Sequence, residues 1–411
     1  MSKTEYPVYR YRWVVLAVFM FVNLTIQTLW ISYAPVTSSA AQFYGVTDLE
    51  IGLLAMSFMI AFIPFSIPAS WVIDTYGFRR GVGIGVILMA IGGVARGLSG
   101  ANFTLVLIST ILIAIAQPFL LNAWTKVPAN WFAVEERATA VGLVTLANLV
   151  GTAIGMVVTP LLSESLDLPT IQLIYGIITV ISTVLFLVLA REKPLTPPCP
   201  PGQDVRALMF DGLKSALRSR MFWLILLISF IGLGIFNGVN TWIEGIVRLR
   251  GFSSTDAGTL GALMLVGGVL GAVIIPSFSD KQRKRKRYLL LGIVLAIPGL
   301  IGLTFATPFW LLIVSAFGLG FFLVSTMPIA MQYAAEITYP TPEGTSNGLI
   351  QLFGQASVVF VFIMNVLKTG DASFTPSLLL AIILLVISAA VITRLRDPEP
   401  ITVPAQDAAS R

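Results

Sequence analysis

The sequence contains no histidine and a single cysteine, Cys199. Without histidine, the chain cannot build Ser-His-Asp or Cys-His catalytic sites, histidine-containing zinc sites or imidazole ligation of haem. One cysteine cannot form an intrachain disulfide. A Gly-rich phosphate loop of the Walker type is also absent, which argues against ATP-driven pumping. We therefore expect neither an enzyme nor a metal site, and no cofactor.

Charge is scarce as well. Charged residues make up 11% of the 411-residue chain and hydrophobic residues 56%, with a mean hydropathy of +0.88. A soluble domain carries about 25% charged residues. The composition therefore predicts a protein of the lipid bilayer.

Twelve apolar runs are long enough to cross a membrane, which takes about 17 to 25 residues each. They lie near 13–37, 49–72, 81–100, 103–126, 137–162, 171–190, 222–246, 257–278, 288–306, 308–334, 345–367 and 375–394. Six spans per half is an even number, so both halves enter the bilayer from the same side. We predict an all-α membrane protein built from two six-helix parallel repeats.

The two halves also repeat particular residues at an offset of 206 positions. The repeated pairs are Gly45 and Gly251, Gly52 and Gly258, Asp74 and Asp280, and Gly142 and Gly348. Internal symmetry of this kind is typical of solute transporters.

Basic residues predict the orientation. With the amino terminus inside, only four of the 26 Lys and Arg residues lie outside, namely Arg96, Arg248, Arg250 and Lys368. The positive-inside rule then places both termini in the cytoplasm, and we expect a monomer in the cell membrane. The net charge of +6 and the run KQRKRKR suit anionic lipid headgroups better than nucleic acid, which we do not expect as a partner.

Domain boundaries follow from the prolines. We predict a first bundle over 1–190, a cytosolic linker over 191–220, a second bundle over 221–396 and a tail over 397–411. The linker combines a proline cluster at 197–201 with a basic amphipathic stretch from Asp204 to Arg220. Prolines prevent one continuous helix there, so the bundles can rock against each other.

The loop between spans 2 and 3, Asp74-Thr75-Tyr76-Gly77-Phe78-Arg79-Arg80, resembles the signature of the major facilitator superfamily, with a degenerate second copy from Asp280 to Arg285. Ser70 and Pro276 depart from the usual glycine. An acid at a helix end can pair with arginines and neighbouring helix termini and so latch one conformation. The alternative is that these charges only mark the inner interface. Our candidate cytosolic gate residues are Asp74, Gly77, Arg79, Arg80, Arg137, Asp280, Lys281 and Glu343.

Polar and aromatic residues form stripes inside four spans. Spacings of three and four place the members of each stripe on one helix face. We predict a substrate site from Asn23, Gln27 and Trp30 in span 1, Gln117 in span 4, Phe236, Asn237 and Asn240 in span 7, and Gln351 and Gln355 in span 11. Amides replace hydrogen bonds to water, and an indole face holds an ammonium group by a cation–π attraction of about 2 kcal/mol when dry.

The stretch from Glu336 to Leu349 is similar to the loop between spans 10 and 11 of the feline leukaemia virus subgroup C receptor family of choline, ethanolamine and haem-linked transporters. Tyr44-Gly45-Val46-Thr47 and Asn130-Trp131-Phe132 look similar too. The resemblance implies a choline site that uses Trp30, Gln117 and Gln355. Asn237 stands where that family has a tyrosine, so one wall of the cage is missing unless Phe236 supplies it.

A purely structural role competes with this interpretation. Amides in membrane helices often only join helices, at about 0.6 kcal/mol per contact, and aromatics often only pack. For Glu244, the one acid inside a span, we expect snorkelling or pairing with Arg248 rather than substrate binding.

Three functions remain open. The simplest is facilitated uniport of a small organic cation such as choline or ethanolamine, because no acid or histidine near the midplane could relay protons. The second is a proton- or ion-coupled symporter or antiporter for organic anions, haem-like or amphipathic compounds. The third is a transporter-like sensor without turnover.

Overall fold

The computed structural model describes residues 9–124, 126–194, 214, 217–338, 343–369 and 373–396. Within these residues, every regular element is a helix, and twelve spans are long and apolar enough to cross a membrane. The predicted fold class and number of spans are therefore confirmed. Most of the linker over 191–220, and the tail over 397–411, lie outside the described residues, so the predicted domain boundaries stay predictions.

The first six spans pack around one shared apolar core. Their helices are α1 (Arg12–Ile31), η1 (Ala34–Val36), α2 (Thr37–Tyr44), α3 (Asp48–Tyr76), α4 (Phe78–Leu98), α5 (Phe103–Leu121), α6 (Lys126–Trp131), α7 (Val134–Ser163) and α8 (Leu168–Leu189). We call this group the first bundle.

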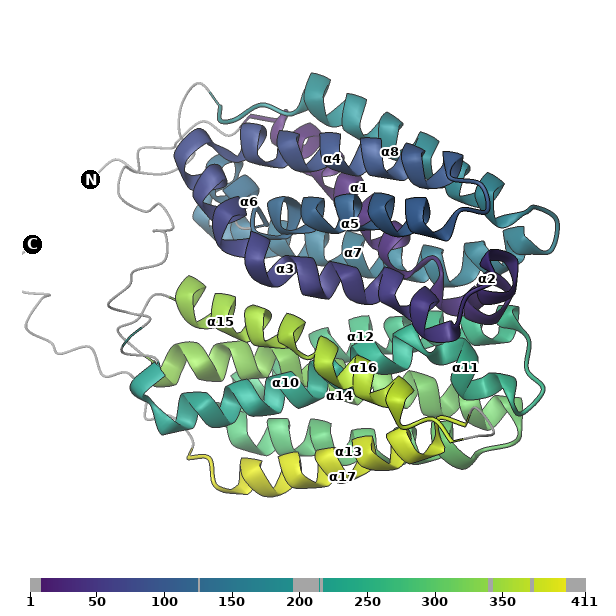
Figure 1. Cartoon of the computed structure of the whole chain (residues 1–411). Helices are drawn as coiled ribbons and strands as arrows, with labels where there is room; N and C mark the ends of the chain where they lie inside the picture. The colour runs from purple at the N-terminus through teal and green to yellow at the C-terminus, as the bar shows by residue number, and fades with distance from the viewer. Residues whose placement is uncertain are drawn as a thin grey trace, which may run out of the picture.

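The last six spans form the second bundle around a second core. Its helices are α10 (Arg220–Thr241), α11 (Ile243–Arg248), α12 (Ser254–Gln282), α13 (Arg285–Phe305), α14 (Phe309–Ile337), α15 (Glu343–Ala356), α16 (Val358–Val366) and α17 (Thr375–Thr393). Figure 1 shows the two bundles side by side with their helices along a common direction.

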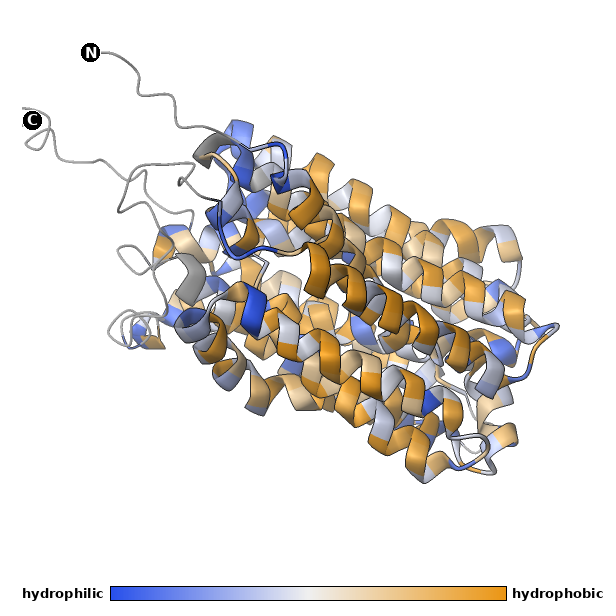
Figure 2. Cartoon of the chain, turned by 90° about the horizontal axis from the view of Figure 1, so that it is seen from above, coloured by the Kyte–Doolittle hydropathy of each residue, from blue (hydrophilic) through white to orange (hydrophobic). Residues whose placement is uncertain are grey.

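We name the two ends of the molecule by the chain. The terminal end is where α1 begins and α17 ends, and the distal end is the opposite one, where α2 and α11 lie (Figure 1). Apolar residues cover the length of the helices and hydrophilic residues gather toward both ends (Figure 2). Large apolar side chains such as Ile67 and Val188 are 69% and 70% exposed on the helix sides. Such a surface is suited to lipid and not to water.

The repeated residues have matching local structure. Thr47 with Glu50 and Ser253 with Asp256 form capping boxes, in which each side chain bonds the other residue's backbone N–H, at the starts of α3 and α12. These boxes satisfy backbone groups that a helix start otherwise leaves unpaired. The glycines just before them, Gly45 and Gly251, have φ angles of +67° and +84°. These positions need glycine because the left-handed region strains other residues.

The second repeated pair of glycines lies between the bundles. A Cβ added to Gly52 would overlap the Trp242 ring, and one added to Gly258 would overlap the backbone oxygen of Met156. Each glycine therefore allows its helix to touch the opposite bundle, near the distal end. Gly142 and Gly348 have open space around the Cβ position, so close packing does not explain their recurrence.

Spans 1 and 7 are broken, whereas the sequence predicted each as one run. Span 1 changes from α1 through η1 to α2, with the break at Ser32 and Tyr33, and span 7 changes from α10 to α11 at Trp242. Pro35, at the start of η1, is the sequence signal for the first break. Both breaks lie close to residues predicted to bind substrate.

Candidate functional site

Trp30 lies at the junction of the two bundles. It is the penultimate residue of α1, it is half-buried, and it packs against the apolar cores of both bundles. Its indole Nε1 donates to the backbone oxygen of Ala55 on α3 at 3.2 Å. The indole is thereby held in place at the boundary that must open and close when two bundles move.

Four predicted amides have no hydrogen-bond partner among the described residues. Gln27 is 9% exposed, while Asn237, Gln351 and Gln355 are half-buried. Gln117 is buried as well, and its Oε1 is unpaired. Unpaired amides inside a membrane protein are costly unless water or a solute completes their bonds. These amides are therefore able to receive a ligand.

The helices that carry these residues pack against one another and across the two bundles. α1 packs against α5, α10 packs against α15, and α15 reaches α3 of the first bundle. Phe236 on α10 is half-buried and packs against the second core. The candidate site therefore consists of Trp30 and Phe236 with the five amides named above.

Asn23 and Asn240 differ from those amides, because the side-chain NH₂ group of each already has a partner, while the Oδ1 of Asn240 is buried and unpaired. Each donates from Nδ2 to the backbone oxygen four residues earlier, at 2.8 and 2.9 Å, and each is fully buried. Asn23 also accepts from the Trp124 indole at 2.8 Å, which joins span 1 to span 4. This geometry favours the structural role for Asn23, whereas the unpaired Oδ1 leaves Asn240 able to accept from a solute. Contact of either residue with substrate stays a prediction.

The distal end holds a polar contact that the sequence did not indicate. Glu244 on α11 accepts from both the backbone N–H and the hydroxyl of Ser38 on α2, each at 2.9 Å. The two residues are 206 positions apart, the repeat offset, so this bond joins equivalent positions of the two bundles. Glu244 is 4% exposed and forms no ion pair with Arg248. The prediction of snorkelling was therefore wrong, and Glu244 meets Arg248 through the Ser38 hydroxyl, to which both are bonded, rather than by the direct ion pair that was predicted.

Asp48 at the start of α3 is the centre of a second distal contact. It forms ion pairs with Arg248 at 3.5 Å and with Lys368 at 3.1 Å, and both cations belong to the second bundle. Arg248 also donates to the Ser38 hydroxyl. We call Ser38, Asp48, Glu244, Arg248 and Lys368 the distal latch. Two of its members are among the four basic residues predicted to lie outside, which was the only sequence signal for it.

At the terminal end, the first copy of the signature loop bonds within its own bundle. Asp74 pairs with Lys126 at 2.5 Å in this conformation, and its pairing with arginines stays a prediction. Glu192 instead accepts from the backbone N–H groups of Phe78 and Arg79, at 2.9 and 2.7 Å. An acid at a helix start is favourable because the helix dipole is positive there.

Gly77 precedes that helix start and explains the glycine of the motif. Its φ is +90°, and a Cβ would lie 2.6 Å from the Glu192 carboxyl carbon. Arg79 donates to the backbone oxygen of Leu187 at 3.1 Å, while Arg80 is exposed and has no partner among the described residues. The loop is therefore a folded structure of the first bundle in this conformation.

The second copy is built differently. Arg285 pairs with Asp280 and with Glu336, the latter at 3.0 Å, all within the second bundle. Arg283 takes the place of Gly77 at the repeat offset and also has a positive φ, +51°. Lys281 is exposed and has no partner among the described residues.

The remaining gate candidate with a described side chain is Arg137. It donates to the backbone oxygens of Phe132 and Ala129, at 3.3 and 3.0 Å, inside the first bundle. The Glu343 side chain lies outside the described residues. Sequence reasoning missed the bidentate pair of Arg12 with Glu136, at 2.7 and 3.0 Å. Among described residues at the terminal end, no ion pair joins the two bundles.

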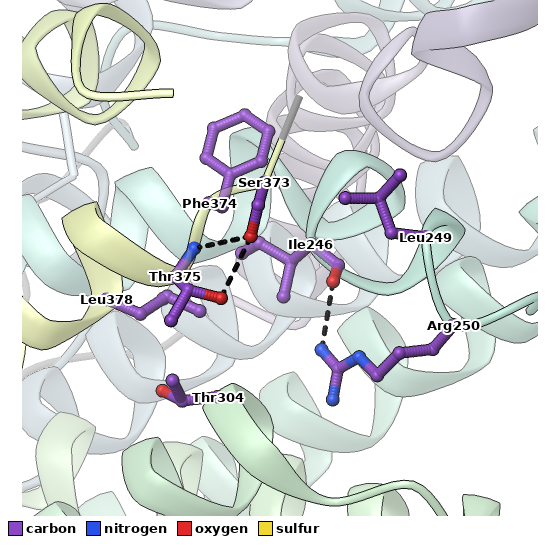
Figure 3. A pocket seen from close by; sticks show the side chains of 8 residues that line it. All are labelled: Ile246, Leu249, Arg250, Thr304, Ser373, Phe374, Thr375 and Leu378. Atoms are coloured by element: carbon purple, nitrogen blue, oxygen red, sulfur yellow. Dashed lines mark hydrogen bonds between the residues drawn. The ribbon is translucent and has the colours of Figure 1, made fainter. Parts of the chain in front are cut away.

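A small cavity of about 120 Å³ lies at the distal end of the second bundle, beside Arg250 (Figure 3). Arg250 donates to the backbone oxygens of Ile246, Leu303 and Ala306 at 2.7 to 2.9 Å. Burial lowers the pKa of its guanidinium. The arginine thereby joins α11 to α13. The residues that line the cavity belong to the second bundle and are far from Trp30 in the sequence.

Comparison with known proteins agrees with this architecture. The model of the Major Facilitator Superfamily matches residues 15–361 and again 248–410. The chain belongs to the major facilitator superfamily. Solute carrier family 49 member A3 of Danio rerio is 31% identical over 91% of this chain and 82% of its own length. The choline/ethanolamine transporter FLVCR2 of Rattus norvegicus is 27% identical over 84% of this chain and 67% of its own length.

Solved structures share the fold. A bacterial homologue of the human lysosomal transporter Spinster superposes with a TM-score of 0.77 at 17% identity, covering 96% of this chain and 100% of the other. The superfamily and the fold are those of transporters and not of enzymes. The protein is thus a multi-pass secondary transporter, which lies in the lipid bilayer and carries a small-molecule substrate.

Proposed function

We propose that the protein is a facilitated uniporter for a small organic cation such as choline or ethanolamine. The observation that carries the proposal is Trp30, a fixed indole between the cores of the two bundles with unpaired amides on the neighbouring spans. An indole face attracts a quaternary ammonium group, and amide oxygens accept from a hydroxyl or primary amine. Relatives that carry the name choline/ethanolamine transporter support the same solute class.

The orientation follows from charge. The positive-inside rule puts the terminal end, with its basic loops, in the cytoplasm and the distal end outside the cell membrane. On that assignment the distal latch closes the outer side, while no ion pair among described residues bridges the bundles on the inner side. We therefore propose that this conformation faces the cytoplasm and that the protein acts as a monomer.

Alternating access then requires two sets of contacts. Solute released to the inside leaves Trp30 and the amides free, and the bundles rock to close the inner side and open the outer one. Opening the outer side must break the Glu244–Ser38 bonds and both Asp48 ion pairs. Closing the inner side brings the two signature loops together. In that state Asp74 and Asp280 can each pair with basic residues or a helix start of the opposite bundle.

Phe236 has a defined part in this proposal. Because Asn237 replaces the tyrosine of the resembling family, Phe236 is the aromatic side chain of span 7 available to face the ammonium group. An amide at position 237 offers hydrogen bonds that a tyrosine ring does not. We expect a preference for cations with a polar head, and weaker binding than a complete aromatic cage gives.

Ion coupling is the competing mechanism, and Glu244 is the observation that favours it. This acid lies buried between the bundles, and it is uncovered whenever the distal latch opens. A proton taken up there could couple to the return step of a symporter or antiporter for organic anions, haem-like or amphipathic compounds. Glu244 lies beyond the end of α10 and bonds Ser38 rather than a residue of the candidate site, which makes uniport the better proposal.

The deciding experiment is uptake into proteoliposomes. Purified protein is first screened by thermal shift with choline, ethanolamine, betaine, carboxylates and haem, and each stabilising compound is then tested for uptake. We expect a choline or ethanolamine shift, and loss of that uptake in Trp30→Ala but not in Trp124→Phe, which removes an indole bonded to Asn23 instead. Uptake of a carboxylate that Trp30→Ala leaves intact would refute the cation site.

An imposed pH gradient separates the two mechanisms in the same vesicles. A uniporter equilibrates choline regardless of the gradient. Accumulation of choline above equilibrium when only the proton gradient is applied would overturn uniport and establish coupling. Glu244→Gln is then the variant in which accumulation should disappear.

A further inference from the structure

Span 1 carries both a candidate site residue and a latch residue, on opposite sides of its break. Trp30 is one residue before the end of α1, and Ser38 is the second residue of α2. Only Ser32, Tyr33 and the short η1 separate the two helices. The geometry of this break therefore decides how Trp30 and Ser38 are oriented relative to each other.

A buried cation lies at the break. Arg96 on α4 is 1% exposed, and it donates to the backbone oxygen of Leu29 at 3.2 Å and to the Ser32 hydroxyl at 3.4 Å. Its guanidinium carbon lies 5.4 Å from the centre of the Tyr33 ring. Ser32 completes the arrangement by donating to the same oxygen of Leu29, at 3.1 Å.

Arg96 has no carboxylate partner among the described residues. Burying a cation without an acid is costly, so its remaining partners must be specific. The last carbonyl groups of a helix lack backbone partners, and the negative end of the helix dipole lies there. A buried guanidinium at the end of α1 satisfies both conditions, and the Tyr33 ring adds a cation–π contact.

The second bundle lacks this arrangement. The residue 206 positions after Arg96 is Gly302, where an added Cβ would overlap the Ser315 hydroxyl. The arginine at the distal end of the second bundle is the partly buried Arg250, which bonds carbonyl groups of α11 and at the end of α13 rather than the end of α10. Of the breaks in spans 1 and 7, the one next to Trp30 is held by a cation from another span, and the one at Trp242 has no such cation among the described residues.

We propose that Arg96 is a positioning residue that holds the end of α1, so that Trp30 and the α2 segment bearing Ser38 keep a fixed relative orientation. Removing the guanidinium leaves the carbonyl of Leu29 and the Ser32 hydroxyl to rearrange, and both the indole and α2 lose their common anchor. The part of this proposal that concerns solute binding rests on the proposed cation site at Trp30. The part that concerns α2 does not.

The α2 segment is tested without any solute. In a Cys199→Ser background, spin labels are placed at Gln42→Cys on α2 and Ser165→Cys after α7, two exposed positions of the first bundle. Their distance distribution is measured by pulsed electron paramagnetic resonance. We expect Arg96→Gln to broaden or shift the distribution and Arg96→Lys to restore it in part, because an ammonium group can still donate to both acceptors.

The control for that measurement is Arg250→Gln, which removes the arginine of the other bundle and should leave the distribution unchanged. If Arg96→Gln does not fold, Ser32→Ala removes one of the two acceptors and should broaden the distribution less. An unchanged distribution in every folded variant at Arg96 and Ser32 overturns the proposal.

Solute binding is tested by a double-mutant cycle with choline as the probe. Arg96→Gln should weaken the choline Kd about tenfold, the usual effect of losing a hydrogen bond to a charged group. Combined with Trp30→Phe, the two losses should be less than additive, because Arg96 acts through the indole. Additive losses would show that Arg96 does not position Trp30. Absence of choline binding in the unaltered protein would refute the proposed cation site instead, and the spin-label result would still decide the role of Arg96.

Discussion

The two ends of the interface between the bundles are built on different principles. At the distal end, bonds cross from one bundle to the other through Ser38, Asp48, Glu244, Arg248 and Lys368. At the terminal end, the ion pairs among described residues stay inside a bundle, as in Asp74–Lys126 and Arg285–Glu336. In the proposed rocking mechanism one end is joined while the other is free, so we interpret the difference as the mark of one conformational state.

The largest expected effect comes from the close contact at Gly258. A side chain there meets the backbone oxygen of Met156, which cannot move aside without shifting α7. Gly258→Val should prevent the distal end from closing and reduce choline transport to about a tenth or less of normal. The steric overlap should raise the free energy of the distally closed state by more than about 1 kcal/mol, which is enough to depopulate it. Transport in proteoliposomes is the measurement.

Gly261→Ala is the matched control, because its Cβ would meet only the flexible Met156 side chain, at 3.0 Å. We expect its transport to be within about twofold of normal, since such a side chain adjusts at little cost. Equal losses in Gly258→Val and Gly261→Ala would show that distal packing is not what limits the cycle.

Next in size is the loss of the acid at the centre of the distal latch. Asp48→Asn keeps the shape at the start of α3 but leaves Arg248 and Lys368 without their shared partner. Because the pair is partly buried, we expect the balance of conformations to shift toward distal opening by about fivefold to tenfold. Labelling of a cysteine introduced at the bundle interface, from the distal side, measures the shift.

Glu50→Gln provides the comparison on the same helix turn. Glu50 bonds only Thr47, so its substitution leaves every contact between bundles intact. Labelling that rises as much in Glu50→Gln as in Asp48→Asn would mean that the start of α3, and not the latch, controls opening.

Local pattern was enough to predict the spans and the glycine of the signature loop, but not the contacts that distinguish the two ends. Apolar length identified twelve spans because bilayer thickness constrains each one separately. Gly77 was recognisable because a motif lies within a few residues. Asp48 meets Arg248 and Lys368 from 200 and 320 positions away, and nothing in the periodicity of single helices encodes such a pairing.

The candidate site shows the same limit. Helical spacing predicts one face for Asn23, Gln27 and Trp30, yet Asn23 bonds Trp124 while Gln27 has no partner among the described residues. Arg96 was counted as an outer charge because it is close to a span end in sequence. Its burial depends on the break in span 1 and on Tyr33, both of which are tertiary features.

A smaller effect is expected at the terminal end of the second bundle. Arg285→Gln removes the cation shared by Asp280 and Glu336, and the Arg285 side chain is 9% exposed. We expect a loss of about 1 to 3 kcal/mol in stability, because two acids lose a largely buried partner. The melting temperature should fall, while the extent of cysteine labelling from the distal side stays normal. A large labelling change would mean that this ion pair also acts between bundles.

The smallest effect in the present conformation should come from Asp74→Asn. Its pair with Lys126 is about one third exposed on both sides, so solvent screening leaves a contribution of about 0 to 1 kcal/mol. Thermal stability should hardly change. If Asp74 instead joins the bundles once the terminal end closes, the variant destabilises only that other state, and the loss appears as slower choline transport at normal melting temperature. Lys126→Gln breaks the same pair from the other side and serves as the comparison: a transport defect in Asp74→Asn that Lys126→Gln lacks assigns a second partner to Asp74. Equal behaviour of the two variants would restrict Asp74 to its own bundle and would remove the terminal latch from the mechanism.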